Sequence, residues 1–249
     1  MSSAADPRSP ERVRKVAEVV ARMILLDAEE LGLGPGDQLM AETKMMELYS
    51  AGRASVREAL RILEVQGVVS IRTGRGGGPV LQRLKTRDVG DSLKLYLQQR
   101  GATYGDVLVA RKTMDPQVAW HAATNATRAD KQMLREMLAE VESIPRSEHR
   151  LLGTTSQRVN SAIGAASHNP VLSLLSQALR DIYSWRVHEW FNDETYWARA
   201  LPHMRHLIAA IESGDADEAE SSIRRELTNE VSFARHHFPG VLHERVRWD

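Results

Sequence analysis

The fold is decided by residues 39–80, which read LMAETKMMELYSAGRASVREALRILEVQGVVSIRTGRGGGPV. The pattern predicts a helix near 41–49, a turn, a second helix near 53–66 and a hairpin with strands near 68–72 and 79–82. Arg53 and Arg57 lie four residues apart at the start of the second helix, so they share one face. The opposite face is an apolar stripe at helical spacing, formed by Val56, Ala59, Leu60 and Leu63. This order of elements is typical of a winged helix-turn-helix.

The charge distribution points to nucleic acid. Although the net charge of the chain is zero, residues 1–87 carry 14 Lys/Arg against 11 Asp/Glu, and residues 88–249 carry 19 against 22. Within residues 53–87 the balance is 8 against 2. Two arginines at a helix start suit the major groove, and a basic glycine-rich loop suits the phosphates beside it. A basic helix alone is as often a solvated surface, so the prediction of DNA binding depends on helix, turn and loop together.

Beyond residue 88 the apolar residues recur at helical spacing, with breaks at Gly, Pro, Asn and Asp. The predicted fold is therefore mostly α: an N-terminal winged helix-turn-helix followed by an antiparallel bundle of about seven helices. The expected organisation is a disordered tail (1–10), a DNA-binding domain (11–82), a linker (83–87), a helical effector-binding and dimerisation domain (88–240) and a C-terminal tail (241–249).

Several classes of protein are excluded by composition. The chain has no cysteine, so it has neither disulfides nor cysteine-based zinc sites. It has no run of 18 apolar residues, and its first residues lack the apolar core of a signal peptide, which predicts a soluble, cytoplasmic protein. It also lacks a phosphate-binding loop, a G-x-S-x-G elbow and an H-E-x-x-H motif, so we expect no enzyme.

The N-terminal segment resembles the DNA-binding domain of the GntR family of bacterial transcription regulators. The resemblance is carried by Leu39, Glu42, the run Val56-Arg57-Glu58-Ala59-Leu60, Gly67 and the wing residues Arg72, Gly74 and Gly76. It implies a repressor that binds palindromic operator DNA as a homodimer. Thr43 stands where the family commonly has a DNA-reading arginine. We expect DNA contacts from Thr43, Arg53, Ala54, Ser55, Arg57, Arg72, Thr73, Gly74, Arg75 and Gly76.

The helical part resembles the ligand-binding domain of the FadR branch of the same family. Three segments carry this resemblance, namely 111–116 (RKTMDP), 165–172 (AASHNPVL) and 210–216 (AIESGDA). Many members of the branch hold a divalent metal with one Asp and three His. Counting from the three segments places those positions at Ser156, Asn160, Met204 and Glu226, which form a poor metal site. We therefore expect no metal and no cofactor; the alternative is a metal-dependent sensor rebuilt from His203 and His206.

Two arginines lie on apolar faces of the predicted bundle, Arg111 in the helix near 104–124 and Arg186 in the helix near 170–191. A buried guanidinium needs a negative or hydrogen-bonding partner. That partner is internal, such as Asp115, Asp181 or Glu226, or it is an anionic ligand; the sequence leaves both open.

The predicted effector pocket consists of Arg111, Ser156, Asn160, Arg186, Met204 and Glu226, with apolar walls. It would hold a fatty acid, an acyl thioester or a small organic acid. A helical-bundle enzyme or acyl-binding protein with an incidental basic head remains the alternative from another class.

Overall fold

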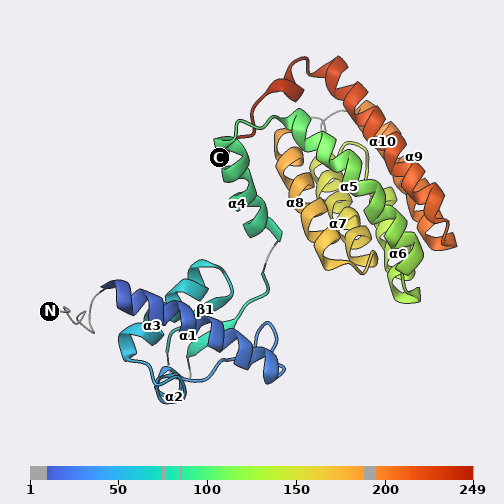
Figure 1. Ribbon diagram of the computed structural model, residues 1–249. Helices are drawn as coiled ribbons and strands as arrows, with labels where there is room; N and C mark the ends of the chain where they lie inside the picture. Colours follow the sequence, from blue (N-terminus) through green and yellow to red (C-terminus); the bar gives the residue numbers. More distant parts are fainter. Residues whose placement is uncertain (1–9, 75–76, 85, 188–193, 249) are drawn as a thin grey trace. The chain divides into compact units, whose positions relative to one another are not determined.

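The computed structural model describes residues 10–74, 77–84, 86–187 and 194–248 (Figure 1). The chain divides into two compact units, Met1–Lys85 and Thr86–Asp249, and we describe each by itself. Most of the predicted N-terminal tail lies outside the described residues, and residue 10 already belongs to a helix. Among the helices in these ranges, none combines the length and the apolar character that crossing a membrane requires.

The first unit contains three helices and a two-stranded hairpin within its described part. Their bounds are α1 (Pro10–Glu30), α2 (Glu42–Leu48), α3 (Arg53–Val65), β1 (Val69–Arg72) and β2 (Gly78–Leu81). The strands pair antiparallel, with Val69 opposite Leu81 and Arg72 opposite Gly78. The elements α2, α3, β1 and β2 match the predicted ones to within one or two residues, and their order is that of a winged helix-turn-helix.

The core of this unit forms where α1 packs against α3. The predicted stripe of α3 is buried, and it meets Ala17, Val20, Ala21 and Ile24 of α1. Met45 of α2 is fully buried in the same cluster. Burial of apolar side chains at about 25 cal/mol per Å² is the main force that holds the three helices together. The opposite side of α3, with Arg53 and Arg57, remains exposed.

The described part of the second unit is built mainly of helices, with one isolated β-bridge between Thr103 and Arg245. Its elements are α4 (Thr86–Gln99), α5 (Tyr104–Asn125), α6 (Arg128–Ser143), α7 (His149–Ala166), α8 (Pro170–Val187), α9 (Glu194–Ser213), α10 (Ala216–His237) and the short 3-10 helix η2 (Val241–His243). The predicted bundle is thus confirmed. The predicted linker at 83–87 overlaps the start of α4.

Several helices of this unit begin with a side-chain cap. Thr103 and Asp106 form a capping box at the start of α5, and Thr127 and Asp130 form another at the start of α6. The side chain of Asp215 caps α10. Such caps satisfy backbone N–H groups that have no partner within the helix.

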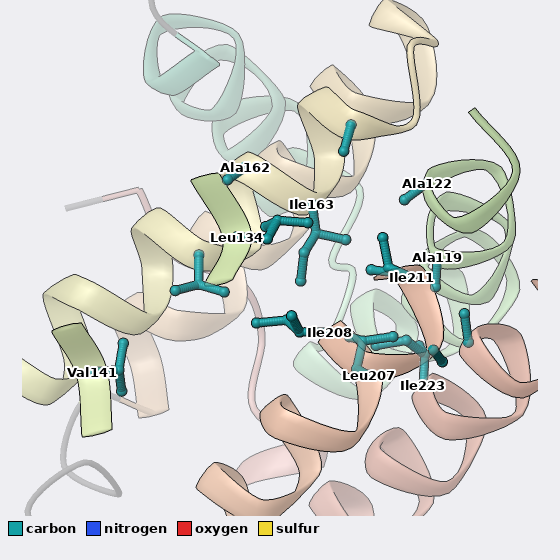
Figure 2. Close-up of a cluster of buried hydrophobic side chains, with 14 of the residues drawn as sticks. Ala119, Ala122, Leu134, Val141, Ala162, Ile163, Leu207, Ile208, Ile211 and Ile223 are labelled. Carbon is teal, nitrogen blue, oxygen red and sulfur yellow. The ribbon is translucent and has the colours of Figure 1, made fainter. Parts of the chain in front are cut away.

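A large apolar cluster lies between α5, α6, α7, α9 and α10. Figure 2 shows Ile163 of α7 converging with Ile208 and Ile211 of α9 and with Ala119 and Ala122 of α5. Each of these side chains is buried. The cluster fixes the helices that carry the polar groups described below.

Most of the described part of the predicted C-terminal tail at 241–249 is packed against the start of α5. Val241 and Val246 are buried in an apolar cluster with Tyr104. The backbone N–H of Tyr104 donates to the carbonyl of Glu244 at 3.0 Å, and that of Val246 donates to the carbonyl of Ala102 at 2.8 Å. Val241 and Val246 stand among mostly polar residues and follow neither helical nor strand spacing. The sequence therefore did not predict this contact.

Candidate DNA-binding surface and effector cavity

The exposed side of α3 begins with the two predicted arginines. Arg53 is the first residue of the helix and Arg57 lies one turn later. Arg53, Ala54 and Arg57 are exposed, as is Thr43 on α2. Ser55, in contrast, is only 8% exposed and lies on the inner side of the helix. We therefore remove Ser55 from the candidate surface. Successive side chains on a helix differ in direction by about 100°, so neighbours of an exposed residue in the motif can point inward.

Arg57 is held in place by a partner that the sequence analysis did not assign. Its Nε donates to Oε2 of Glu42 on α2 at 3.1 Å, and both side chains are accessible to solvent. Arg61, one turn further along α3, pairs with Glu58 at 2.7 Å instead. Arg61 also lines a hollow between α1 and α3, together with Arg14 and Glu18 of α1. The two arginines therefore have different surroundings although they carry the same charge.

The first turn of α3 also offers backbone groups to an anion. Its N-cap residue, Gly52, makes no side-chain capping bond, and the first turn contains no acidic residue. The first N–H groups of a helix have no partner within the helix, and they lie at the positive end of its dipole. A phosphate beside Gly52 and Arg53 would satisfy both features.

The hairpin loop continues the basic surface. Arg72, Thr73 and Gly74 are exposed, and Gly74 has a positive φ of 104° that favours glycine. A Cβ on Gly77 would lie 2.2 Å from the carbonyl oxygen of Arg72, so the tight turn requires glycine there. The predicted contacts Arg75 and Gly76 lie outside the described residues.

The second candidate site is centred on the buried Arg111 of α5, whose side chain is 6% exposed. Its Nε donates to Oδ2 of Asp115 at 3.1 Å, and its Nη1 donates to Oε1 of Glu230 on α10 at 3.2 Å. Oδ2 of Asp115 also lies 3.2 Å from Nη2 of Arg180 on α8, and the hydroxyl of Ser176 donates to Oδ1 of Asp115 at 2.6 Å. The sequence left open whether Arg111 pairs with an internal acid or with an anionic ligand. The structure shows internal acids as its partners. Asp115 was among those predicted; Glu230, 119 residues away, was not.

The two acids on Arg111 have opposite pKa shifts. Burial alone would raise the pKa of Asp115, but Arg180 and Arg111 together lower it below its ordinary value. Burial raises the pKa of Glu230, and the nearby charge of Glu226 raises it further, while Arg111 acts in the opposite direction. Burial opposes the charge of Arg111, yet Glu230 and Asp115 outweigh it, so the pKa of Arg111 is raised. Glu230 is therefore the weaker of the two anionic partners.

A cavity of about 70 Å³ lies beside this network. Four of the predicted effector residues line it, namely Arg111, Ser156, Asn160 and Glu226. Met204 does not; it packs against the apolar cluster of the bundle. The side chain of Arg186 lies outside the described residues. The remaining lining residues are Gly153, Gln157, Gln177, Arg180, Asp181, Tyr183, Ser184, Tyr196 and Glu230.

Of the thirteen residues that line this cavity, only Gly153 lacks a polar side chain, although the carbon atoms of these side chains still supply part of the predicted apolar wall. The polar residues come from α5, α7, α8, α9 and α10, so no single helix shows the pattern. An adjoining cavity of about 430 Å³ between α9 and α10 shares Tyr196, Glu226 and Glu230 with it. The shared residues place the two cavities side by side.

Ser156 contributes an unusual group to the cavity. Its side chain is buried, and its Oγ has no hydrogen-bond partner among the described residues. A buried hydroxyl without a partner is costly to a folded protein, by about 1–3 kcal/mol. A ligand in the adjacent cavity would supply the missing bond.

The four positions at which the resemblance to the FadR branch would place a metal do not fit one. They offer a hydroxyl (Ser156), an amide (Asn160), one carboxylate (Glu226) and a thioether (Met204) that lies away from the cavity. Divalent transition metals prefer imidazole, thiolate and carboxylate ligands. The described ranges contain no group of three or more His, Cys, Asp or Glu side chains placed to hold a metal ion.

The alternative metal site at His203 and His206 is not supported by the contacts of these residues. His206 pairs with Glu218, which also binds Arg225, and the guanidinium of Arg225 lies 3.3 Å from the ring of His206. His203 lies beside the hydroxyl of Ser222, with 3.4 Å between Nδ1 and Oγ. The two histidines thus have separate partners, and a guanidinium occupies the space beside one of them.

Together, the two units define a class of protein: a transcription regulator with a winged helix-turn-helix head and a helical ligand-binding domain. Two family models match the chain, "Bacterial regulatory proteins, gntR family" over residues 16–77 and "FCD domain" over residues 106–229. The chain belongs to the GntR family, in its FadR branch. Members of this family bind operator DNA, the FCD domain binds a small-molecule effector, and the chain is not an enzyme.

Individual relatives agree with this assignment. The "Uxu operon transcriptional regulator" of Escherichia coli (strain K12) is 28% identical over 204 residues, covering 78% of this chain and 77% of the relative. The "Putative L-lactate dehydrogenase operon regulatory protein" of the same organism is 26% identical over 223 residues, covering 86% and 84%. The structure of Streptococcus agalactiae GntR has the same fold, with a TM-score of 0.65 at 19% identity, covering 86% of this chain and 98% of that one.

Proposed function

We propose that this regulator is a cytoplasmic homodimeric repressor whose two heads bind the half-sites of a palindromic operator. A two-fold protein fits two-fold DNA. Arg53 and Arg57 enter the major groove, with Thr43 and Ala54 beside them. The residues of the hairpin loop, Arg72, Thr73, Gly74, Arg75 and Gly76, contact the phosphates and the minor groove. The exposed start of α3, with its uncapped N–H groups, supports this arrangement.

The effector that fits the small cavity best is a small hydroxylated carboxylic acid. The observation that carries this proposal is the unpartnered Oγ of Ser156, which lies in a cavity with polar walls. Hydroxyl and amide groups from Ser156, Asn160 and Gln177 suit hydroxyl groups of a ligand, and arginine binds carboxylates through two parallel hydrogen bonds. A fatty acid would leave these polar groups without partners, which is unfavourable.

The carboxylate of the effector takes the place of Glu230 on Arg111. Asp115 remains paired, because two arginines and Ser176 hold it. Glu230, with its raised pKa, takes up a proton when it is displaced, so acid favours effector binding. The exchange moves α10 relative to α5 and α8 and so favours a conformation with weaker operator affinity.

The name of one relative agrees with this ligand class. The relative from Escherichia coli is named for an L-lactate dehydrogenase operon, and L-lactate is a small hydroxy acid. We extend to this chain only the class, a short carboxylic acid with at least one hydroxyl group.

A thermal-shift titration of Ser156→Ala tests the effector site. The probes are L-lactate and D-gluconate, with decanoate as the fatty-acid comparison. We expect a hydroxy acid to raise the melting temperature of the wild-type chain by mass action, and decanoate to have no effect. Ser156→Ala folds at least as well as the wild type, because its hydroxyl has no partner to lose, and it loses the response.

Ser176→Ala is the matched control, because it removes a hydroxyl that donates to Asp115 at 2.6 Å. We expect this variant to be less stable but to keep the response to the hydroxy acid. Stabilisation by decanoate alone would contradict the proposed ligand class, and a full response in Ser156→Ala would place the site elsewhere.

A further inference from the structure

The larger cavity, of about 430 Å³ between α9 and α10, has no part in the effector site proposed above. Three of the described residues that line it also line the smaller cavity, namely Tyr196, Glu226 and Glu230. Four of the remaining seven have apolar side chains, Ala198, Ala200, Pro202 and Phe233; the others are Arg199, His203 and Asn229. In the smaller cavity, by contrast, every lining residue except Gly153 has a polar side chain. A polar cavity and a more apolar one therefore lie side by side.

The apolar wall of the larger cavity is centred on Phe233 of α10. Phe233 is 4% exposed and belongs to a buried apolar cluster, so its ring is fixed. The ring centroid of Tyr196 on α9 lies 6.0 Å from that of Phe233, in an edge-to-face arrangement, and the guanidinium of Arg199 lies 4.5 Å from the same centroid. Ala198 and Asn229, which also line the cavity, are exposed to solvent. The cavity thus combines a fixed aromatic wall with a solvent-accessible rim.

The volumes of the two cavities indicate how a ligand divides between them. A cavity of about 150 Å³ is large enough to hold benzene. The smaller cavity, of about 70 Å³, has less than half of that volume, so it has room for little more than the carboxyl and hydroxyl head of a hydroxy acid. The larger cavity, of about 430 Å³, has ample room for a ring. A polar head needs hydrogen-bond partners, whereas an apolar group gains free energy when it leaves water for apolar walls.

The boundary between the cavities includes a side chain that the proposed function already displaces. Glu226 and Glu230 lie one turn apart on α10, and both line the two cavities. Oε1 of Glu230 accepts a hydrogen bond from Nη1 of Arg111 at 3.2 Å. Glu230 therefore stands where a ligand on Arg111 would extend into the larger cavity.

We propose that the effector is a 2-hydroxy acid with an apolar group of the size of a phenyl ring, and that it occupies both cavities. Its carboxylate pairs with Arg111, its hydroxyl bonds to Ser156, and its apolar group lies against Phe233 once Glu230 has been displaced. This ligand class rests on the proposed function, because it extends the ligand from the same head site. A hydroxy acid without the apolar group uses the head site alone, and an apolar acid without the hydroxyl leaves Ser156 without a partner.

Isothermal titration calorimetry of the full chain compares three probes, L-lactate, L-3-phenyllactate and 3-phenylpropionate. We expect L-3-phenyllactate to bind at least about tenfold more tightly than L-lactate, because its ring is buried against apolar walls. The compound 3-phenylpropionate has the ring but no hydroxyl group, so it should bind several-fold more weakly than L-3-phenyllactate. Equal binding of the two ring compounds would overturn a ligand that is held at both ends.

Two variants fill the larger cavity from opposite sides, Ala198→Phe from α9 and Asn229→Phe from α10. Both positions are exposed, so neither substitution disturbs the core. Each variant should lose most of the tenfold advantage of L-3-phenyllactate and keep the affinity for L-lactate. Ala209→Phe is the matched control, because Ala209 is exposed on α9 and does not line the cavity. It should bind both hydroxy acids as the wild type does.

The results separate a failure of the apolar site from a failure of the head site. If L-lactate binds the wild-type chain and L-3-phenyllactate binds no more tightly, the larger cavity takes no part of the effector, while the proposed head site stands. If neither hydroxy acid binds, the head site and its extension both fail. A full advantage of L-3-phenyllactate in both cavity-filling variants would overturn the placement of the ring against Phe233.

Discussion

Arginine has opposite surroundings in the two units of this protein. In the second unit, the side chain of Arg111 is 6% exposed and lies between Asp115 and Glu230. In the head, the side chain of Arg57 is 65% exposed and has a single accessible partner, Glu42. A buried arginine with its own acids first stabilises the fold, whereas an exposed arginine at a helix start is available to an anion outside the chain.

The starts of the helices differ in the same way. Thr103 and Thr127 cap α5 and α6, while α3 begins after Gly52 with no side-chain cap. In the second unit, side chains thus satisfy these polar groups at the starts of α5, α6 and α10, although α7 begins without such a cap, whereas in the head neither α2 nor α3 has one. This difference indicates which unit binds the polyanion, and the following variants test it in order of decreasing effect.

The largest effect should come from Asp115→Ala. The substitution leaves Arg111 and Arg180 without their common carboxylate, and breaking a buried ion pair costs about 3–5 kcal/mol. Chemical denaturation of the full chain measures it. Glu140→Ala is the control, because Glu140 pairs with Arg158 at the surface, where the loss is about 0–1 kcal/mol. Equal losses in the two variants would remove the distinction between buried and exposed pairs.

Removing a cap should have an intermediate effect. Thr103→Ala deletes the hydroxyl that accepts from the N–H of Asp106, so we expect a loss of about 1 kcal/mol in stability. Thr113→Ala is a suitable control, because its hydroxyl bonds only to the carbonyl of Val109 within a helix. If the two variants melt together, the capping box contributes nothing that is specific to the helix start.

Adding a cap to α3 should separate stability from binding. Gly52 has φ −68° and ψ 154°, and open space surrounds its Cβ position, so a side chain fits there. Gly52→Asp should stabilise the head by a few tenths of a kcal/mol, because it caps the helix and complements its dipole. It should also weaken DNA binding, since it places a negative charge beside the phosphates. Gly52→Ser, a cap without charge, should retain more affinity; equal affinities in the two variants would contradict a phosphate at this end.

The smallest expected effect is a change in pH dependence. Because the pKa of Glu230 is raised in the folded chain, its ionisation becomes unfavourable as the pH rises above about 4. Glu230→Gln removes this contribution, so the stability of the variant relative to the wild type should increase with pH. Asp115→Asn should show the opposite sign. Because the pKa of Asp115 is lowered in the folded chain, its ionised form stabilises the fold above about pH 4, and this stabilisation is lost as the pH falls. Melting curves at several pH values measure both trends, and parallel curves for the two variants would contradict the assignment.

The sequence predicted local features better than distant ones. The helices and the hairpin followed from periodicity and from Gly, Pro and Asn breaks, and Arg111 was placed inward because its apolar neighbours share its face. Its partner Glu230 and further polar residues beside Ser156, such as Gln177 and Ser184, were not predicted, since they come from helices far apart in the chain. Ser55 was misplaced because a motif gives the order of residues and not the direction of each side chain.

The central claim is that the exposed start of α3 reads DNA, and a matched pair of arginine variants tests it most directly. The probe is a duplex selected by the full wild-type chain from a random-sequence pool, titrated by fluorescence anisotropy. Arg57→Ala should bind this duplex about 1–3 kcal/mol more weakly than the wild type. Arg61→Ala removes the same charge from the same helix but on the side towards α1, and it should bind nearly as well as the wild type. Equal losses of DNA affinity in the two variants would show that only the net charge of the helix matters. An unchanged affinity in Arg57→Ala would contradict the assignment of α3 as the recognition helix.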